Sequence, residues 1–210
     1  MKLTLSGIAL LLLLSCNNKK EAETVSADKK AADSMRASKR ERPSVNPYAP
    51  VDISPMDMSY FPADYPKLKM AKATTAPPLA RVVYSRPHLE GRHIFHEVLK
   101  YEEPWRLGAN EATELDLFSD ATIQDKKIKS GRYILYCIPH KDSWTIVLNS
   151  NIDSWGLEPD PSKDIARFTV PVMKMKVSVE YFTMVFEKKE PGAELVMAWD
   201  DAEVRLPIQF

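Results

Sequence analysis

From about residue 79 to the end of the chain, apolar and polar residues alternate with a period of two. The clearest stretches are 144–148, 168–172 and 195–199, where every second residue is large and apolar. This alternation is typical of β-strands that bury one face. Residues 204–208 predict a last strand, and the short connection through Asp200, Asp201 and Ala202 predicts a hairpin between it and the preceding strand.

Shorter apolar segments at 81–84, 114–118 and 131–138 add further strands. Around Tyr181 the apolar set switches from odd to even positions, which predicts a β-bulge there. Seven to nine short strands without a convincing amphipathic helix indicate an all-β protein with a single antiparallel β-sandwich, jelly-roll-like in form. A small β-barrel is the alternative.

The N-terminus has the pattern of a lipoprotein signal peptide. Lys2 gives a positive start, residues 3–14 are mostly apolar, and Ser15 precedes Cys16. About 12 apolar residues are too few to span a bilayer, which needs about 20. We therefore expect residues 1–15 to be removed, and the acylated Cys16 to hold the exported protein to a membrane. Asn17 favours the outer membrane, on a face that the sequence leaves open.

The next two segments differ in composition from the sandwich. Residues 16–50 contain the lipidated cysteine and a polar stretch with few large apolar residues, which predicts a disordered tether. Residues 51–78 are rich in proline, but Met56, Tyr60 and Phe61 are too apolar for a plain linker. We expect a strap ordered against the domain at 79–210; the alternative is that these side chains form a partner-binding epitope.

Charge and glycine content exclude several classes. The chain has 29 Lys and Arg against 29 Asp and Glu, and this balance argues against a nucleic-acid partner. Its 6 glycines form no glycine-rich phosphate loop, so no nucleotide cofactor is expected. Beyond Cys16 there is one thiol, Cys137, in an apolar run where a cysteine behaves as a small buried hydrophobe.

Polar residues concentrate between 85 and 113, where the alternation is largely absent. The candidate ligand-binding residues in this stretch are Arg86, Arg92, Trp105, Arg106, Asn110 and Glu111. Guanidinium groups form planar forks that suit a carboxylate or phosphate, so convergence of these side chains predicts a site for an anion or a sugar acid. The alternative is that each arginine ties down an irregular connection by bonding backbone carbonyls.

The four tryptophans divide into two pairs. Trp144 and Trp199 alternate with core positions, which predicts burial. Trp105 and Trp155 lie outside the predicted strands, so either ring is a candidate platform for stacking a glycan. Loop packing is the alternative for both rings.

A metal site is a second possibility. His88, His93 and His96 fall within nine residues, and imidazole suits zinc. The helix-borne His-Glu-x-x-His arrangement of zinc hydrolases is missing, so surface histidines are the alternative.

Three short strings together resemble a known family. They are Tyr84-Ser85-Arg86-Pro87, Gly91-Arg92, and the run from Trp105 to Thr113, which reads WRLGANEAT. The chain is similar on these residues to a family of uncharacterised bacterial envelope proteins, often lipoproteins, known as a domain of unknown function. The similarity extends to the lead-in at 54–58. The resemblance implies domain boundaries and no reaction.

Taken together, the sequence predicts a lipid-anchored envelope protein that acts as a binding or assembly module, with a small anion or a glycan as ligand. One alternative is a hydrolase or metal-dependent enzyme with Arg106 and Glu111 in its site. Another is a structural subunit that binds an envelope protein partner.

Overall fold

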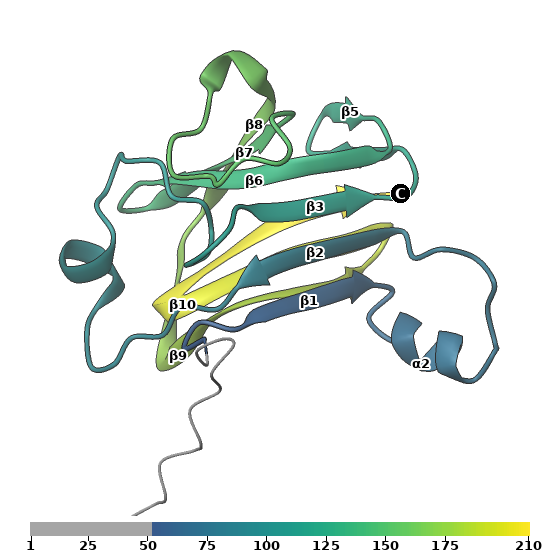
Figure 1. Cartoon of the computed structure of the whole chain (residues 1–210), viewed down its shortest axis with the longest axis horizontal. Coiled ribbons are helices and arrows are strands. Elements are labelled where there is room, and N and C mark those ends of the chain that lie inside the picture. Colours follow the sequence, from purple (N-terminus) through teal and green to yellow (C-terminus); the bar gives the residue numbers. More distant parts are fainter. Residues whose placement is uncertain (1–51) are drawn as a thin grey trace, which may run out of the picture. The chain divides into compact units, whose positions relative to one another are not determined.

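A computed structural model describes residues 52–210, apart from the side chain of His96. The predicted signal peptide, Cys16 and the tether lie outside the described residues. The described part is one compact unit, Asp52–Phe210, built from two antiparallel sheets (Figure 1). Among these residues, no helix has the length and apolarity needed to cross a membrane.

The first sheet has six strands in the order β1-β2-β3-β6-β7-β8. Neighbouring strands in this sheet follow one another directly in the chain, except that β3 pairs with β6. The strands are β1 (Met56–Phe61), β2 (Ala80–Ser85), β3 (Thr113–Leu117), β6 (Gly131–Pro139), β7 (Ser143–Asn149) and β8 (Asp164–Pro171).

The second sheet has four strands in the order β5-β4-β10-β9. Two of them are short and two are unusually long. They are β4 (Ala121–Ile123), β5 (Lys126–Ile128), β9 (Met173–Lys189) and β10 (Gly192–Gln209). Figure 1 shows β9 and β10 lying behind the first sheet, so that the two sheets form layers. The sandwich prediction is confirmed, and the sheets do not close into a barrel.

The predicted hairpin at Asp200 to Ala202 is wrong. β10 continues through these residues to Gln209, and the hairpin instead joins β9 to β10, with Lys189 opposite Gly192. Asp200 has φ +52°, and the register of β10 against β9 shifts on both sides of it. Aspartate tolerates this left-handed conformation both in turns and in bulges. Here it kinks a strand that continues.

The predicted bulge near Tyr181 is confirmed. Ala198 pairs with Thr183, whereas Asp200 pairs with Val179, so β9 has two extra residues in this interval. Phe182 and Met184 are fully buried beyond the bulge, while Tyr181 is exposed. Because side chains in a strand alternate with a period of two, two extra residues leave the alternation in phase. The expected change of the core-facing set is therefore not observed, and Val177 before the bulge is 73% exposed.

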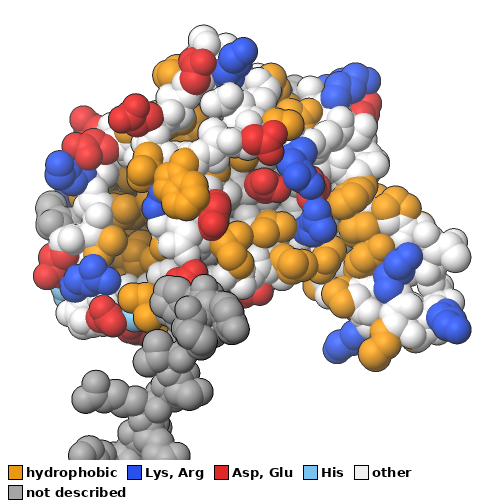
Figure 2. All heavy atoms as spheres, viewed as in Figure 1, with side chains coloured by type: hydrophobic (Ala, Val, Ile, Leu, Met, Phe, Trp, Pro, Cys, Tyr) orange, Lys and Arg blue, Asp and Glu red, His pale blue; other side chains and the backbone are white. Residues whose placement is uncertain are grey.

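The proline-rich segment that was predicted as a strap supplies β1 to the first sheet. β1 pairs with β2 over six residues, from Met56 opposite Ser85 to Phe61 opposite Ala80. A short helix, α2 (Tyr65–Met70), follows and projects from the body (Figure 1). Figure 2 shows hydrophobic and Lys or Arg side chains together at this projection, where Met70 is 81% exposed.

Three tryptophans from separate segments meet in the core. Trp144 lies on β7, Trp199 on β10, and Trp105 in the connection between β2 and β3. The ring centroid of Trp105 is 5.8 Å from that of Trp144 and 5.6 Å from that of Trp199. Trp144 and Trp199 are fully buried, as predicted. This cluster anchors the β2–β3 connection to both sheets.

Candidate functional site

The β2–β3 connection, residues 86–112, contains most of the polar residues that the sequence singles out. Its only regular element is a π-helical turn at Ile94–Val98. Backbone amides and carbonyls outside strands need other partners when they are buried. The arginines of this connection therefore have two competing uses, as scaffold and as ligand-binding groups.

Arg86 is used as scaffold. Its Nε donates to the carbonyl oxygen of Phe182 at 3.2 Å, and its Nη2 donates to Thr183 Oγ1 at 3.1 Å. Its Nη1 lies 3.2 Å from the Asp57 carboxylate. The side chain thus ties β9 to β1 and the end of β2.

Arg92 bonds mainly to its own loop. Nε donates to the carbonyl of Leu89 at 2.8 Å, and Nη2 donates to the carbonyl of His88 at 3.0 Å. These bonds fix the turn before the π-helical segment. The positive charge remains available to act on a neighbouring ligand at longer range.

Asn110 and Glu111 have different environments. The Asn110 side-chain amide donates to Asp52 Oδ2 at 2.6 Å and to the Ser54 carbonyl at 3.2 Å. These bonds hold the segment before β1 against the β2–β3 connection. Glu111 is exposed, and its charge acts on Arg106. Neither residue lines the pocket described below.

Trp105 is a core residue in this structure. It is 8% exposed, its backbone pairs with Cys137 through two hydrogen bonds of 2.8 Å, and its Nε1 donates to the Gly108 carbonyl at 3.3 Å. Trp155 is 58% exposed. Of the two predicted stacking platforms, only Trp155 presents its ring broadly to solvent.

Arg106 stands apart from the other arginines. Its Nη2 donates to the carbonyl of Ala109, but its Nη1 is buried and has no hydrogen-bond partner among the described residues. Burial lowers the pKa of the Arg106 guanidinium, and the Glu111 carboxylate partly offsets this effect. Arginine nevertheless stays protonated at neutral pH, so a partly buried positive charge with an unused donor remains.

A tight turn places Arg106. Leu107 has φ +56°, and its carbonyl accepts a 2.6 Å hydrogen bond from Thr113 Oγ1. Gly108 follows, and a Cβ there would lie 3.4 Å from the Ser85 backbone. The backbone of this turn is therefore held against the end of β2, which restricts where the Arg106 side chain can lie.

Arg106 lines a pocket of about 470 Å³. The charged or titratable residues of the lining are His88, Glu90, Arg92 and Arg106. Most of the remaining lining residues are apolar, including Ile53, Pro87, Val98, Leu99, Pro104 and Leu157. The rings of Trp105 and Trp199 also contribute. This volume is in the range of small-molecule sites.

The loop between β7 and β8 supplies one wall of the pocket through Gly156 and Leu157. Gly156 has φ +83°, and a Cβ at this position would lie 2.8 Å from Ala112 Cβ and 3.2 Å from Arg106 Cβ. Only a glycine lets the loop approach the Arg106 segment this closely without displacement. The loop and the arginine are thus in direct contact.

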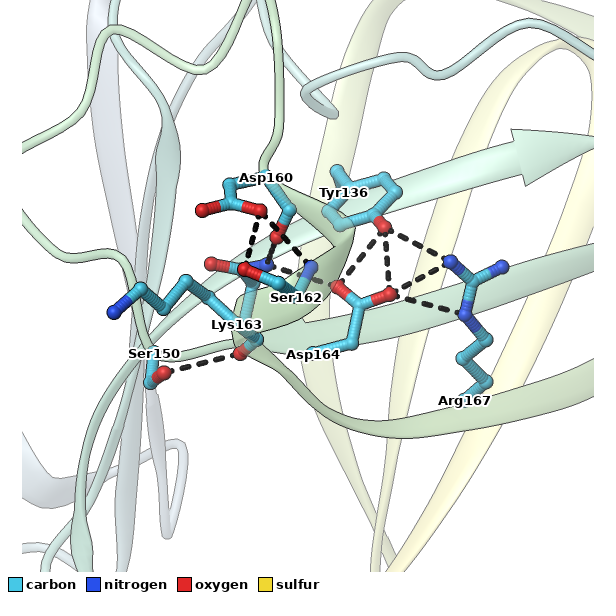
Figure 3. Close-up of polar contacts among 8 residues, drawn as sticks. Tyr136, Ser150, Asp160, Ser162, Lys163, Asp164 and Arg167 are labelled. Atoms are coloured by element: carbon cyan, nitrogen blue, oxygen red, sulfur yellow. Dashed lines mark hydrogen bonds and ion pairs between the residues drawn. The ribbon is translucent and has the colours of Figure 1, made fainter.

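A polar network fixes the base of this loop (Figure 3). Figure 3 shows Tyr136 and Arg167 directed at the carboxylate of Asp164. The Tyr136 hydroxyl donates to both carboxylate oxygens, at 3.0 and 3.1 Å, and Arg167 Nη2 donates at 2.6 Å. Asn149 Nδ2 donates to Asp164 Oδ1 and to the Asp160 carbonyl, both at 2.8 Å. Desolvation, reinforced by Asp164, raises the pKa of Tyr136 to about 12.

The described histidines of the loop have separate partners. His88 stacks on Tyr181, with centroids 5.4 Å apart, and its Nε2 lies 3.7 Å from Glu90 Oε1. His93 Nδ1 lies 3.1 Å from Asp200 Oδ2. Within residues 52–210, no group of three His, Cys, Asp or Glu side chains is arranged to hold a metal ion. The side chain of His96 is outside this description.

Of the six candidate ligand-binding residues, the pocket brings together Arg92, Trp105 and Arg106. The contribution of Ile53, Gly156 and Leu157 was not predicted. The sequence holds a weak signal for it, because Trp155-Gly156 interrupts the alternation between two clear strands. That signal indicates an irregular loop between the two strands, but it does not indicate what the loop packs against.

Comparison with known families gives a match over residues 67–208, to a protein family of unknown function, DUF2911. The chain belongs to this family. The DUF2911 match covers β2 to β10, including the β2–β3 connection and the β7–β8 loop, and it begins after the lead-in at 54–58. Neither the curated proteins nor the solved structures include a significant match.

Proposed function

We propose that this protein is a lipid-anchored envelope lipoprotein whose sandwich domain binds a small organic anion in the pocket beside Arg106. The observation that carries the proposal is the buried Nη1 of Arg106, which has no hydrogen-bond partner among the described residues although its side chain lines the pocket. A buried donor without an acceptor is costly, by about 1 to 3 kcal/mol or more for a charged group. An anionic ligand would supply the missing acceptor.

The chemistry of the guanidinium suits this role. Carboxylates and phosphates accept parallel hydrogen bonds from its planar fork, and such charge-assisted bonds are stronger than neutral ones. Partial burial strengthens them further because water competes less. Arg92 adds a second positive charge to the lining.

A thermal-shift screen tests the binding proposal. Protein of residues 17–210 retains the described core, and it would be titrated with phosphate, simple carboxylates and sugar acids. A ligand that binds only the folded state raises the unfolding midpoint by mass action. We expect a dose-dependent rise that is lost in Arg106→Gln and kept in Lys67→Gln, which removes the same charge on exposed α2. No rise with any anion would contradict the proposal.

The envelope location rests on the sequence of residues 1–16 and has its own test. Metabolic labelling with a fatty acid, followed by membrane fractionation, should label the wild-type chain in the outer membrane. Cys16→Ser should abolish the label and release the protein from the membrane fraction. An unlabelled wild-type chain would remove the lipid anchor from the proposal without affecting the pocket.

A hydrolase is the second candidate, because His88 and Glu90 line the same pocket as Arg106. A histidine beside a carboxylate is a suitable general base for an attacking water, and a nearby guanidinium stabilises developing negative charge. Assays with carboxylic and phosphate esters test this candidate. Turnover that His88→Gln abolishes, while anion binding persists, would favour it over a pure binding module.

A further inference from the structure

We infer that the anion held beside Arg106 is a monocarboxylate with an apolar chain. This inference rests on the proposed anion-binding function and narrows its ligand class. It combines the charge balance of the pocket lining with the chemistry of the surrounding walls.

The charge balance selects a single negative charge. Arg92 and Arg106 are positive and Glu90 is negative in the lining, and the Glu111 carboxylate also acts on Arg106. A monocarboxylate places one negative charge beside the two guanidinium groups, which is the smallest charge that an anion can bring. A phosphate dianion brings a second negative charge into a pocket that already contains the Glu90 carboxylate, and like charges in a partly buried site repel.

The walls select an apolar group attached to the acid. Val98 and Leu99 come from the end of the π-helical turn, Pro104 from the following loop, and Leu157 from the β7–β8 loop. Leu157 is 65% exposed and Ile53 is 69% exposed, although both line the pocket. A bound apolar chain covers such surfaces, and removing apolar area from water is favourable.

The carboxylate end is fixed by two facts already established. Arg106 Nη1 has no partner among the described residues, whereas the Nε and Nη2 of Arg92 donate to loop carbonyls. The buried donor of the lining that still lacks an acceptor is therefore on Arg106. The chain of the ligand then extends along the apolar walls, and its methylene groups contribute affinity in proportion to the area buried.

Calorimetric titration of residues 17–210 with acetate, butyrate, hexanoate and octanoate tests the inference, with phosphate and octanol as comparisons. We expect affinity to rise about fourfold per added methylene, which corresponds to about 0.8 kcal/mol for each buried CH₂. Octanoate should bind far more tightly than octanol or phosphate, and Arg106→Gln should reduce the octanoate affinity to that of octanol.

A wall variant with a matched control separates the chain from the acid. Leu157→Ser should flatten the dependence on chain length and leave acetate binding unchanged. Ile165→Ser makes the same change at a residue that is 50% exposed and does not line the pocket, so it should have no effect.

The possible failures are distinguishable. Equal affinity for acetate and octanoate, or tighter binding of phosphate, overturns the inference and leaves the anion-binding proposal intact. Equal affinity for octanoate and octanol overturns the assignment of the carboxylate to Arg106. Absence of binding by every compound, phosphate included, overturns both the inference and the proposed function.

Discussion

The indole ring of Trp105 stacks on that of Trp199, with centroids 5.6 Å apart and an angle of 23° between the ring planes. Trp105 is in an irregular connection and Trp199 in the longest strand, so this contact joins the pocket segment to the second sheet. A ring that lines the pocket is thus also part of the core.

Trp105→Ala should lower the free energy of unfolding by about 3 to 5 kcal/mol, because it leaves a cavity among the rings of Trp144, Phe182 and Trp199. Trp155→Ala is the matched control, since Trp155 is 58% exposed, and it should change stability by less than about 0.5 kcal/mol. Chemical denaturation of both variants measures the difference. Similar small effects would mean that Trp105 is not part of the core.

Gly156→Ala should be more destabilising than Gly91→Ala. Both glycines have a positive φ, +83° and +79°, so each alanine meets about 1 to 2 kcal/mol of backbone strain. Only at Gly156 does the new Cβ also overlap a neighbour, at 2.8 Å from Ala112 Cβ, whereas nothing lies within 4 Å of it at Gly91. We expect a further loss of about 1 to 3 kcal/mol at Gly156. Thermal or chemical unfolding of the two variants checks this, and equal losses would contradict the close packing of the loop.

The pair formed by His93 and Asp200 should make stability depend on pH. The hydrogen bond to Asp200, with further help from Glu97 and Asp201, raises the pKa of His93. Burial of Asp200 acts to raise its own pKa, but the hydrogen bonds from His93 and Ser178 outweigh this and the pKa is lowered.

The two shifts define a pH window. The contribution of His93 is fully present below its unfolded pKa, near 6.5, and is lost as pH rises through its raised folded pKa. The contribution of Asp200 is present above the unfolded carboxyl pKa and is lost as pH falls through the lowered one. The stability difference between wild type and His93→Gln should therefore be larger at pH 5.5 than at pH 9. NMR titration should give a pKa for His93 that falls in Asp200→Asn, and an unchanged pKa would contradict the pairing.

Tyr136→Phe should weaken the network that holds the β7–β8 loop. It removes one donor to the Asp164 carboxylate while Arg167 and Asn149 remain, so we expect a loss of about 1 to 2 kcal/mol at neutral pH. Because the folded pKa of Tyr136 is about 12, its contribution declines as pH rises above the ordinary tyrosine value, near 10. Denaturation at pH 7 and pH 10.5 measures both effects. Tyr65→Phe on α2 is the control, and it should change the free energy of unfolding only slightly at either pH.

Most of the fold follows from alternation that the sequence displays directly. The strands around Trp144, Phe168 and Leu195 are found where the period of two places them, and a bulge lies at Tyr181 as predicted. The hairpin at Asp200 was mispredicted because aspartate has the same positive φ in a turn and in a kinked strand. Pairing with β9, which is distant in sequence from the end of β10, decides between the two.

The sequence predicted which types of residue gather near the candidate site, but it did not predict what each arginine does there. Arg86, Arg92 and Arg106 all suit an anion, but their roles depend on which backbone carbonyls the fold brings within reach of each guanidinium. Two of them find such partners or an acidic side chain, and Nη1 of Arg106 does not. The contact of Gly156 with Arg106 joins segments about 50 residues apart, which no local pattern specifies.

The pairing of β1 with β2 also has a practical consequence for where a recombinant fragment should start. A chain begun at Leu79, where the alternating pattern sets in, would lack β1 and leave β2 as the outermost strand of the first sheet. Its unpaired amides and carbonyls would then be a template for pairing with another molecule. A fragment that begins at Asp52 keeps β2 paired and leaves the native strand β1 at the edge of the sheet. We therefore expect the 27 residues 52–78, of which Phe61 belongs to the core, to decide whether a preparation is soluble or aggregated.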